Sequence, residues 1–310
     1  VARLASEAPG SCFKVAEALI DAGLPPGVVT VITGQASKLA ALLIAAPAIR
    51  KVSLTGSIAV GKKVLAQCAE GIKRASMELG GHAPVIVHRD ADPVATAKAA
   101  AMAKFRNTGQ VCIAPTRFFV HESIKAPFEE AFVGYTKTIV VGDGLKDGVT
   151  MGPMIRGSAV DGALELVQDA VDKGGRLLHG GKRPAHLNKG HFLEPTVIAD
   201  VPDDARIMSE EPFAPIAPLV TFSDDDEVIE RANALPFGLA SYVFSNDAER
   251  AQRTADRIEA GMVGINEMLI SAAEIPFGGI KESGYGREGG SLGVKDYLEP
   301  KFIRHKLVRT

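Results

Sequence analysis

The chain has 310 residues, of which 46% are hydrophobic, and its formal net charge is −2 at pH 7. This length is enough for one large or two ordinary domains, and so balanced a charge gives no reason to expect nucleic acid or a membrane surface as a partner. The longest apolar candidate for a membrane span, residues 39–49, is too short and contains Pro47.

The three cysteines, at positions 12, 68 and 112, show neither metal-ligand nor disulfide spacing. No cluster of histidine, cysteine and aspartate has ligand spacing either, so we expect no metal. Unpaired cysteines fit a reducing compartment and no signal-peptide pattern is visible, so we expect a cytoplasmic protein.

Helical and extended patterns alternate along the chain. Residues 11–22 carry apolar side chains at helical spacing and end at Gly23, which predicts a helix with a glycine stop. We expect strands at 28–32 and 51–55, and helices over 37–46 and from Gly56 to about Cys68. Later, we expect helices over 92–106, 123–138 with Ser123 as cap, 160–171, 226–234 and 247–260, and extended segments at 117–121, 192–198, 240–244 and 262–266. Such alternation is typical of a doubly wound α/β fold.

Thr55-Gly56-Ser57 stands where a strand passes into a helix. Backbone N–H groups at a helix N-terminus bind phosphate, and glycine permits close approach, so this turn is a candidate dinucleotide contact. The alternative is an ordinary capped helix.

Cys112 follows the polar segment Asn107-Thr108-Gly109-Gln110, which ends a small-residue helix. The glycine permits a strained backbone that turns the next residues into a cleft, and the cations Lys104 and Arg106 would favour a thiolate. This pattern indicates a nucleophile. The alternative is an inert buried cysteine.

Glu78 ends a strand-like run and is followed by Leu79 and the pair Gly80-Gly81. A carboxylate beside such a hinge has the freedom to admit a cofactor and later to activate water, which suits a general base. The alternative is an ordinary solvated glutamate at a turn.

The pairing of Glu-Leu-Gly-Gly at 78–81 with Asn-x-Gly-Gln-x-Cys at 107–112 resembles the aldehyde dehydrogenases. The likeness continues through 55–57, 210–213 and 276–281 and covers essentially the whole chain; segments 104–110 and 261–290 look closest to succinate-semialdehyde dehydrogenase. It implies an α/β, aldehyde dehydrogenase-like fold. Its expected parts are the C-terminal part of an NAD(P)-binding domain at 1–80, with the N-terminal part absent, a catalytic domain at 81–283, and a C-terminal segment at 284–310 with an oligomerisation strand.

The resemblance also implies residue roles. Cys112 would be the nucleophile and Glu78 the base for hydrolysis, while the Cys112 N–H would be one oxyanion donor. The cofactor would be contacted by Gly56 and Ser57 at the pyrophosphate, by Leu79, by Glu211 at the nicotinamide ribose and by Phe213 beside the ring. Ala214 departs from the usual glycine of the family.

The first residues bear on the choice of dinucleotide. Against the family pattern, Arg3 falls at a lysine, and Ser6 falls where NAD-preferring members have a glutamate that would repel a 2′-phosphate. We therefore favour NADP, with NAD possible because Glu7 is one position away.

Arg106 and Ser271 match the residues that bind the substrate carboxylate in succinate-semialdehyde dehydrogenases. The alternatives are a cation at a helix C-terminus and an ordinary loop serine. Many relatives carry a second cysteine two residues after the nucleophile, but Ala114 stands here, so a vicinal disulfide is not available.

The expected function is the NAD(P)-dependent oxidation of a carboxylate-bearing aldehyde, with succinate semialdehyde favoured and 2-oxoglutarate semialdehyde or another aldehyde as alternatives. Two further alternatives are a catalytically incomplete fragment with only structural or oligomerisation competence, and a cysteine acyl-transferase or hydrolase that needs no nucleotide. The loosely alternating tail, which includes Tyr297, Phe302 and Val308, would pair with a second subunit in a dimer or tetramer; a solvated edge strand would look the same.

Overall fold

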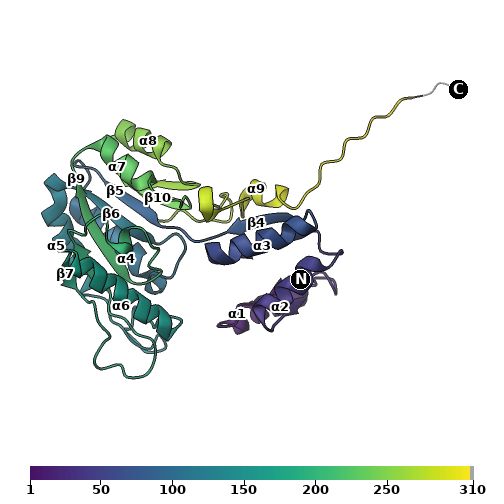
Figure 1. The fold of residues 1–310 in the computed structure, drawn as a ribbon, viewed down its shortest axis with the longest axis horizontal. Coiled ribbons are helices and arrows are strands. Elements are labelled where there is room, and N and C mark those ends of the chain that lie inside the picture. The colour runs from purple at the N-terminus through teal and green to yellow at the C-terminus, as the bar shows by residue number, and fades with distance from the viewer. Residues whose placement is uncertain (308–310) are drawn as a thin grey trace. The chain divides into compact units, whose positions relative to one another are not determined.

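The computed structural model describes residues 1–307, which form two compact units (Figure 1). The first comprises Val1–Ser53 with Ala59–Ala75, and the second comprises Leu54–Ile58 with the described chain from Ser76 onward. Among the described residues, no helix combines the length and the apolar character that a membrane span requires.

The first unit is a small α/β body. Strands β1 (Ala2–Arg3) and β2 (Val31–Ile32) pair in parallel. Its helices are α1 (Pro9–Asp21), α2 (Ala36–Ala45) and the part of α3 (Ile58–Glu70) from residue 59 on. Its buried apolar side chains include Leu4, Ile44, Val64 and Cys68.

Two predicted elements in this part of the chain begin later than expected. The strand expected from residue 28 begins only at Val31, because the Val28 N–H donates to the Pro25 carbonyl (3.3 Å) in a turn where Gly27 has φ +85°. Helix α3 begins at Ile58, two residues after Gly56.

A seven-stranded sheet organises the second unit, with the order β11-β10-β5-β6-β9-β8-β7. The strands are β5 (Ala83–Val87), β6 (Pro115–His121), β7 (Arg176–His179), β8 (Thr196–Ala199), β9 (Ile216–Phe222), β10 (Ala240–Phe244) and β11 (Met262–Ile265). Every neighbouring pair is parallel except β7 with β8. The predicted α/β class is therefore confirmed.

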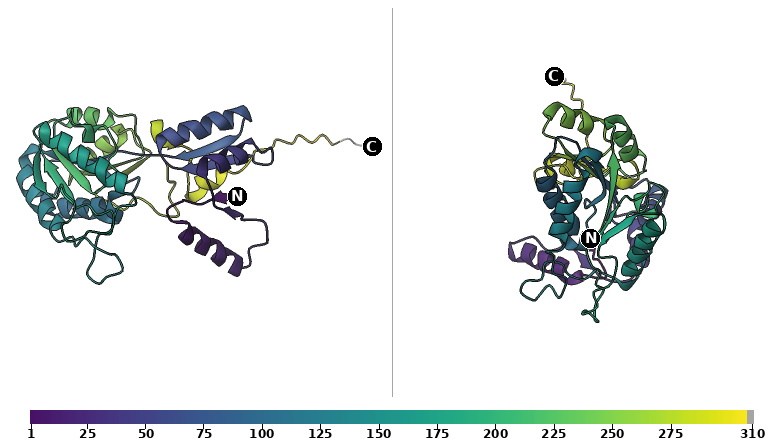
Figure 2. Two further views of the ribbon diagram at one scale, coloured as in Figure 1. Left: turned by 60° about the horizontal axis from the view of Figure 1, so that its bottom comes forward. Right: turned by 90° about the vertical axis from the view of Figure 1, so that its left-hand side faces the viewer.

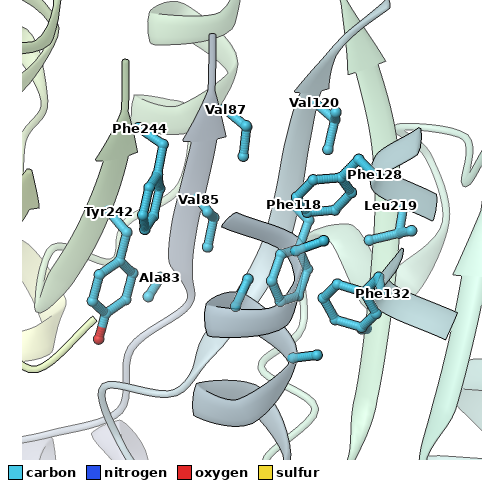
Figure 3. Close-up of a cluster of buried hydrophobic side chains, with 14 of the residues drawn as sticks. Ala83, Val85, Val87, Phe118, Val120, Phe128, Phe132, Leu219, Tyr242 and Phe244 are labelled. Carbon is cyan, nitrogen blue, oxygen red and sulfur yellow. The ribbon is translucent and has the colours of Figure 1, made fainter. Parts of the chain in front are cut away.

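Helices cover both faces of this sheet (Figure 2). The helices of the unit after α3 are α4 (Pro93–Phe105), α5 (Lys125–Thr136), α6 (Gly157–Asp172), α7 (Asp225–Asn233), α8 (Ala248–Arg257) and α9 (Gly290–Lys295). Side chains alternate along the strands, so Val85 and Val87 join the cluster that contains α4 and α5 residues (Figure 3), whereas Ile86 joins the cluster that contains α6 and α7 residues.

Local caps explain why most helix starts match the prediction. Asp92, Asp224 and Asp247 each accept two backbone N–H bonds from the first turn of α4, α7 and α8. The predicted Ser123 cap is wrong: residues 122–124 form a 3-10 turn that His121 caps through the Ser123 N–H, and α5 begins at Lys125.

Strand β4 (Arg74–Glu78) ends at the predicted base, and its last residues pair with the antiparallel strand β12 (Gly284–Tyr285), Glu78 opposite Gly284. The described residues after α9, 296–307, include no strand, and Val308 lies outside the described residues. Pairing of this tail with a second chain stays a prediction.

Candidate active site

The loop between α4 and β6 reverses through three consecutive left-handed residues. The φ angles are +50° at Asn107, +58° at Thr108 and +70° at Gly109. A Cβ at position 109 would stand 2.3 Å from the Ala214 carbonyl oxygen, so this position requires glycine for both its φ and its space. We expected strained backbone at the glycine alone, but Asn107 and Thr108 share it.

Side chains of the loop hold this conformation. The Thr108 hydroxyl donates to the Gly152 carbonyl (3.3 Å), and the Gln110 side-chain oxygen accepts from the Ile155 N–H (3.2 Å). The strained segment is therefore anchored to the chain that precedes α6, as backbone strain persists only where its surroundings over-determine it.

Cys112 lies in a hydrogen-bonded β-turn directly after this segment. The Ala114 N–H donates to the Val111 carbonyl (2.9 Å), which places Cys112 at the first central position of the turn. Its side chain is half-buried, unlike the fully buried Cys68, so it is not the inert core cysteine of the alternative interpretation.

Glu78 is buried, only 5% exposed, at the carboxyl end of β4. A Cβ on Gly278 would stand 2.8 Å from its Oε1, and its Oε2 has no hydrogen-bond partner among the described residues. Burial, helped by the Glu288 carboxylate and opposed by Arg287, raises the pKa of Glu78 to about 7. It is not a solvated surface glutamate, and its pKa suits a base at neutral pH.

Gly80 and Gly81 lie between the Glu211 carboxylate and the backbone of Cys112. The Gly81 N–H donates to Glu211 Oε1 (3.3 Å), and a Cβ on Gly80 would stand 2.5 Å from Glu211 Oε2. A Cβ on Gly81 would stand 3.1 Å from the Cys112 carbonyl. Gly80 and Gly81 therefore pass between the Cys112 backbone and Glu211 with no room for side chains, which brings the predicted nucleophile and cofactor carboxylate close to the end of β4 that carries Glu78.

The charges around Cys112 differ from those expected. Burial raises the pKa of its thiol, the Glu78 and Glu211 carboxylates raise it further, and the N–H groups of Ile113 and of Cys112 itself lower it. The prediction that Lys104 and Arg106 favour the thiolate is wrong, because burial and then the two carboxylates raise the pKa of the thiol and neither cation is among the groups that lower it.

Lys104, which we expected to favour the thiolate, interacts electrostatically with Glu211 instead. It is fully buried, and its Nζ has no hydrogen-bond partner among the described residues. Burial lowers the pKa of Lys104 to about 7, opposed by Glu211, while burial raises the pKa of Glu211 to about 7, opposed by the Gly81 N–H and Lys104. The burial of Lys104 could have been predicted from helical spacing, since it continues the buried stripe of Ala97, Ala100 and Ala101.

We expect Lys104→Met to stabilise the protein near neutral pH by about 1–3 kcal/mol, because it removes a buried cation that has no hydrogen-bond partner among the described residues. The folded pKa of about 7 lies below the unfolded value, so wild-type stability should rise with pH above 7, and the advantage of the variant should shrink toward pH 10. Denaturant unfolding at several pH values measures this, with Lys98→Met, an exposed position on the same helix, as control. Destabilisation at every pH would mean that Lys104 is paired.

A cavity of about 550 Å³ opens beside the loop that precedes Cys112. Its walls include Asn107, Gln110, His191 and Phe213. Phe213 is 42% exposed and has φ +38°, an unusual conformation for an aromatic residue. A strained, exposed aromatic ring on a cavity wall is suited to stacking against a planar ligand.

The other predicted site residues lie in both compact units. The Gly56 N–H donates to the Glu78 carbonyl (3.0 Å) and the Leu79 N–H to the Ser283 carbonyl (3.0 Å), while Ser57 is exposed. Arg106 and Ser271 are both exposed in the second unit.

In the first unit, the Arg3 guanidinium donates to Ser6 Oγ (2.7 Å) and to the Gly34 carbonyl (3.3 Å). Among the described residues, no group of histidine, cysteine and carboxylate side chains is arranged to hold a metal ion.

Fold and site together define a doubly wound α/β protein in which a half-buried thiol lies within electrostatic range of two carboxylates whose pKa values are raised by burial. The chain belongs to the aldehyde dehydrogenase family, whose model matches residues 1–303. It is 45% identical to 3-sulfolactaldehyde dehydrogenase of Pseudomonas putida and 44% identical to the NADP(+) succinate-semialdehyde dehydrogenase GabD of Escherichia coli, each over 98% of this chain. The crystal structure of an E. coli NADP-dependent enzyme superposes with a TM-score of 0.93 at 43% identity, over 96% of this chain and 61% of that one.

The chain spans 62% of the length of each of these two curated relatives. The predicted family and fold are therefore confirmed, whereas the activity of the whole protein is a matter for the proposal below.

Proposed function

We propose that this chain carries the thiol site of an NAD(P)-dependent aldehyde dehydrogenase whose substrate bears an anionic group, with succinate semialdehyde favoured. One observation carries the proposal: the half-buried Cys112 lies within electrostatic range of Glu78, a buried carboxylate with an unpartnered oxygen and a pKa near 7. That combination supplies a nucleophile and a base in one site.

The chemistry follows from these two groups. The Cys112 thiolate attacks the aldehyde carbon, and the resulting oxyanion is stabilised by the Cys112 backbone N–H. Loss of hydride from that carbon leaves a thioester on the sulfur. Glu78 then takes a proton from water, whose oxygen attacks the thioester, so that the acid leaves and the thiol is regenerated. Oxidation and hydrolysis are thus two separate steps.

The residues present fit a nicotinamide dinucleotide, which when bound accepts the hydride. Glu211 and Phe213 would hold the nicotinamide ribose and ring, with the cavity wall at Phe213 as the supporting feature. Arg3 and Ser6, which already share a hydrogen bond, form a donor pair suited to a 2′-phosphate, and we therefore favour NADP over NAD. Gly56 and Ser57, ahead of α3, would contact the pyrophosphate.

The proposed substrate class rests on Arg106. Its guanidinium is exposed at the C-terminal end of α4, six residues before the nucleophile, where a carboxylate could be bound bidentately. Ser271 would add a hydroxyl donor. The names of the two relatives describe aldehydes with a sulfonate and a carboxylate, which share an anionic terminus.

A steady-state comparison of short aldehydes with and without a terminal carboxylate, under NADP and under NAD, tests the proposal. We expect the highest kcat/KM for succinate semialdehyde with NADP. Equal rates for uncharged aldehydes would contradict the substrate class. Ester hydrolysis with no dinucleotide-dependent oxidation of any aldehyde would instead indicate an acyl-transferring enzyme, since hydrolysis needs only the thiol and the base.

We expect Arg106→Ala to lower kcat/KM for succinate semialdehyde by about 100-fold, because a charged hydrogen-bonded pair is lost. The kcat/KM for an uncharged aldehyde of similar length should stay nearly unchanged. Arg89→Ala, at another exposed arginine, is the matched control. Equal losses with both aldehydes would refute a carboxylate contact.

The domain boundaries 1–80, 81–283 and 284–310 and a homo-oligomeric assembly through the C-terminal segment belong to the same proposal. The tail supports the assembly because Phe302, Ile303 and Leu307 are each more than 70% exposed in the isolated chain. Light scattering of the intact protein and of a chain that ends at residue 295 tests the assembly.

A further inference from the structure

The turn that presents Cys112 is fixed from a distant strand. Tyr242 lies in the middle of β10, between Val85 of β5 and Gly264 of β11. Its side chain is 1% exposed, and its hydroxyl donates to the Ile113 carbonyl over 2.6 Å, across 129 positions of sequence. Figure 3 shows the ring in the buried cluster, with the hydroxyl directed away from Phe244.

The ring has little freedom to move. It packs in the same core cluster as Val85, and a Cβ on Gly264 would stand 3.2 Å from its Cδ1. A close-packed ring with one rotatable hydroxyl is a rigid donor, so the position of the Ile113 carbonyl is set by the sheet rather than by the loop.

Two other contacts complete the support of the turn. The Ala114 N–H closes it on the Val111 carbonyl (2.9 Å), and Gly81 lies against the Cys112 carbonyl. The Tyr242 hydroxyl thus adds a side-chain hydrogen bond, at the Ile113 carbonyl, to the contacts that hold the turn. The carbonyl it satisfies is buried, and a buried carbonyl left without a donor costs free energy that drives the peptide to reorient.

We propose that Tyr242 is a positioning residue for the nucleophile: its hydroxyl fixes the Val111–Ala114 turn so that the Cys112 sulfur stays beside the N–H groups of Cys112 and Ile113. The inference rests on the proposed function of Cys112 as nucleophile. Tyr242 touches no reacting atom, and it acts only through the turn.

The electrostatic surroundings agree with this placement. Burial raises the pKa of the Tyr242 hydroxyl well above its usual value, Arg106 opposes the rise, and Cys112 adds to it. The hydroxyl therefore keeps its proton and stays a donor at every working pH, within electrostatic range of both the nucleophile and the proposed anion contact.

The test is the rate of Cys112 alkylation by iodoacetamide as a function of pH, without dinucleotide or aldehyde. A Cys12→Ser background removes the exposed thiol, and Cys68 is buried, so labelling of the Cys112 peptide by mass spectrometry reports one site. We expect Tyr242→Phe to raise the midpoint of the profile by about 0.5–1 pH unit and to slow alkylation at pH 7 by about three- to tenfold. Glu78, Glu211 and Arg106, the charged groups around the sulfur and the hydroxyl, are the same in both proteins.

Two further variants separate positioning from packing. Tyr135→Phe removes a hydroxyl from another residue packed on the same cluster and should leave the profile unchanged. Tyr242→Leu removes the ring as well; it should lower the melting temperature further than Tyr242→Phe without moving the profile further. Superimposable profiles for wild type and Tyr242→Phe, or shifts that follow melting temperature, would overturn the inference.

Because alkylation needs no turnover, this outcome is independent of whether aldehyde oxidation is observed. If the enzyme turns over, Tyr242→Phe should lower kcat and leave KM for the aldehyde unchanged.

Discussion

Replacing Cys112 by alanine is expected to abolish aldehyde oxidation, with a loss of at least about 10⁴-fold in kcat, because the proposed thioester forms on its sulfur. Dinucleotide binding should persist, since the proposed cofactor contacts Glu211 and Phe213 are untouched. Formation of the reduced dinucleotide, followed by absorbance, measures the first effect, and fluorescence titration with NADPH measures the second.

Cys12→Ala is the matched control, because it removes an exposed thiol from the other compact unit. It should retain full activity. Undiminished formation of reduced dinucleotide by Cys112→Ala would end the assignment of this residue as nucleophile. Failure of the control instead would point to Cys12.

Replacing Glu78 by glutamine should slow the hydrolytic half of the cycle by about 10²–10⁴-fold while the first oxidation survives. Rapid mixing should then show one equivalent of reduced dinucleotide per site, followed by slow turnover, and the acylated Cys112 peptide should be found by mass spectrometry. Glu274→Gln, at an exposed position, is the control.

The pH dependence carries a second signature of Glu78. Its pKa of about 7 means that the basic form predominates only above that pH, so hydrolysis in the wild type should rise as pH increases through about 7. The glutamine variant should lack this rise. A variant that shows neither a burst nor a flattened profile would remove Glu78 from the hydrolytic role.

Local sequence signals predicted much of the fold. Helices with aspartate caps, at Asp92, Asp224 and Asp247, begin where expected because a cap acts within one turn. Strands β5 and β9 were not predicted at all. Each contains an internal proline, Pro84 in β5 and Pro218 in β9, which argues against a strand, whereas the equally buried β10 has none and was predicted.

The site, like the fold, was predicted from the sequence only in part. Cys112 and Glu78 were predicted because their motifs are short and specific, and the glycines around them indicated close approach. The burial of Lys104 arises from helix packing, and the Tyr242 hydrogen bond joins residues 129 positions apart, so residue types alone encode neither. The effect of the two carboxylates on the sulfur likewise depends on tertiary contacts.

The fit of Gly109 against the Ala214 carbonyl has a consequence for protein engineering. A loop of three left-handed residues is not a self-contained part that can be transplanted, since its shape is complementary to a segment a hundred positions further along. A scaffold that receives residues 107–112 must also receive 213–215, and libraries that vary either segment by itself will sample mostly sequences in which the thiol is misplaced.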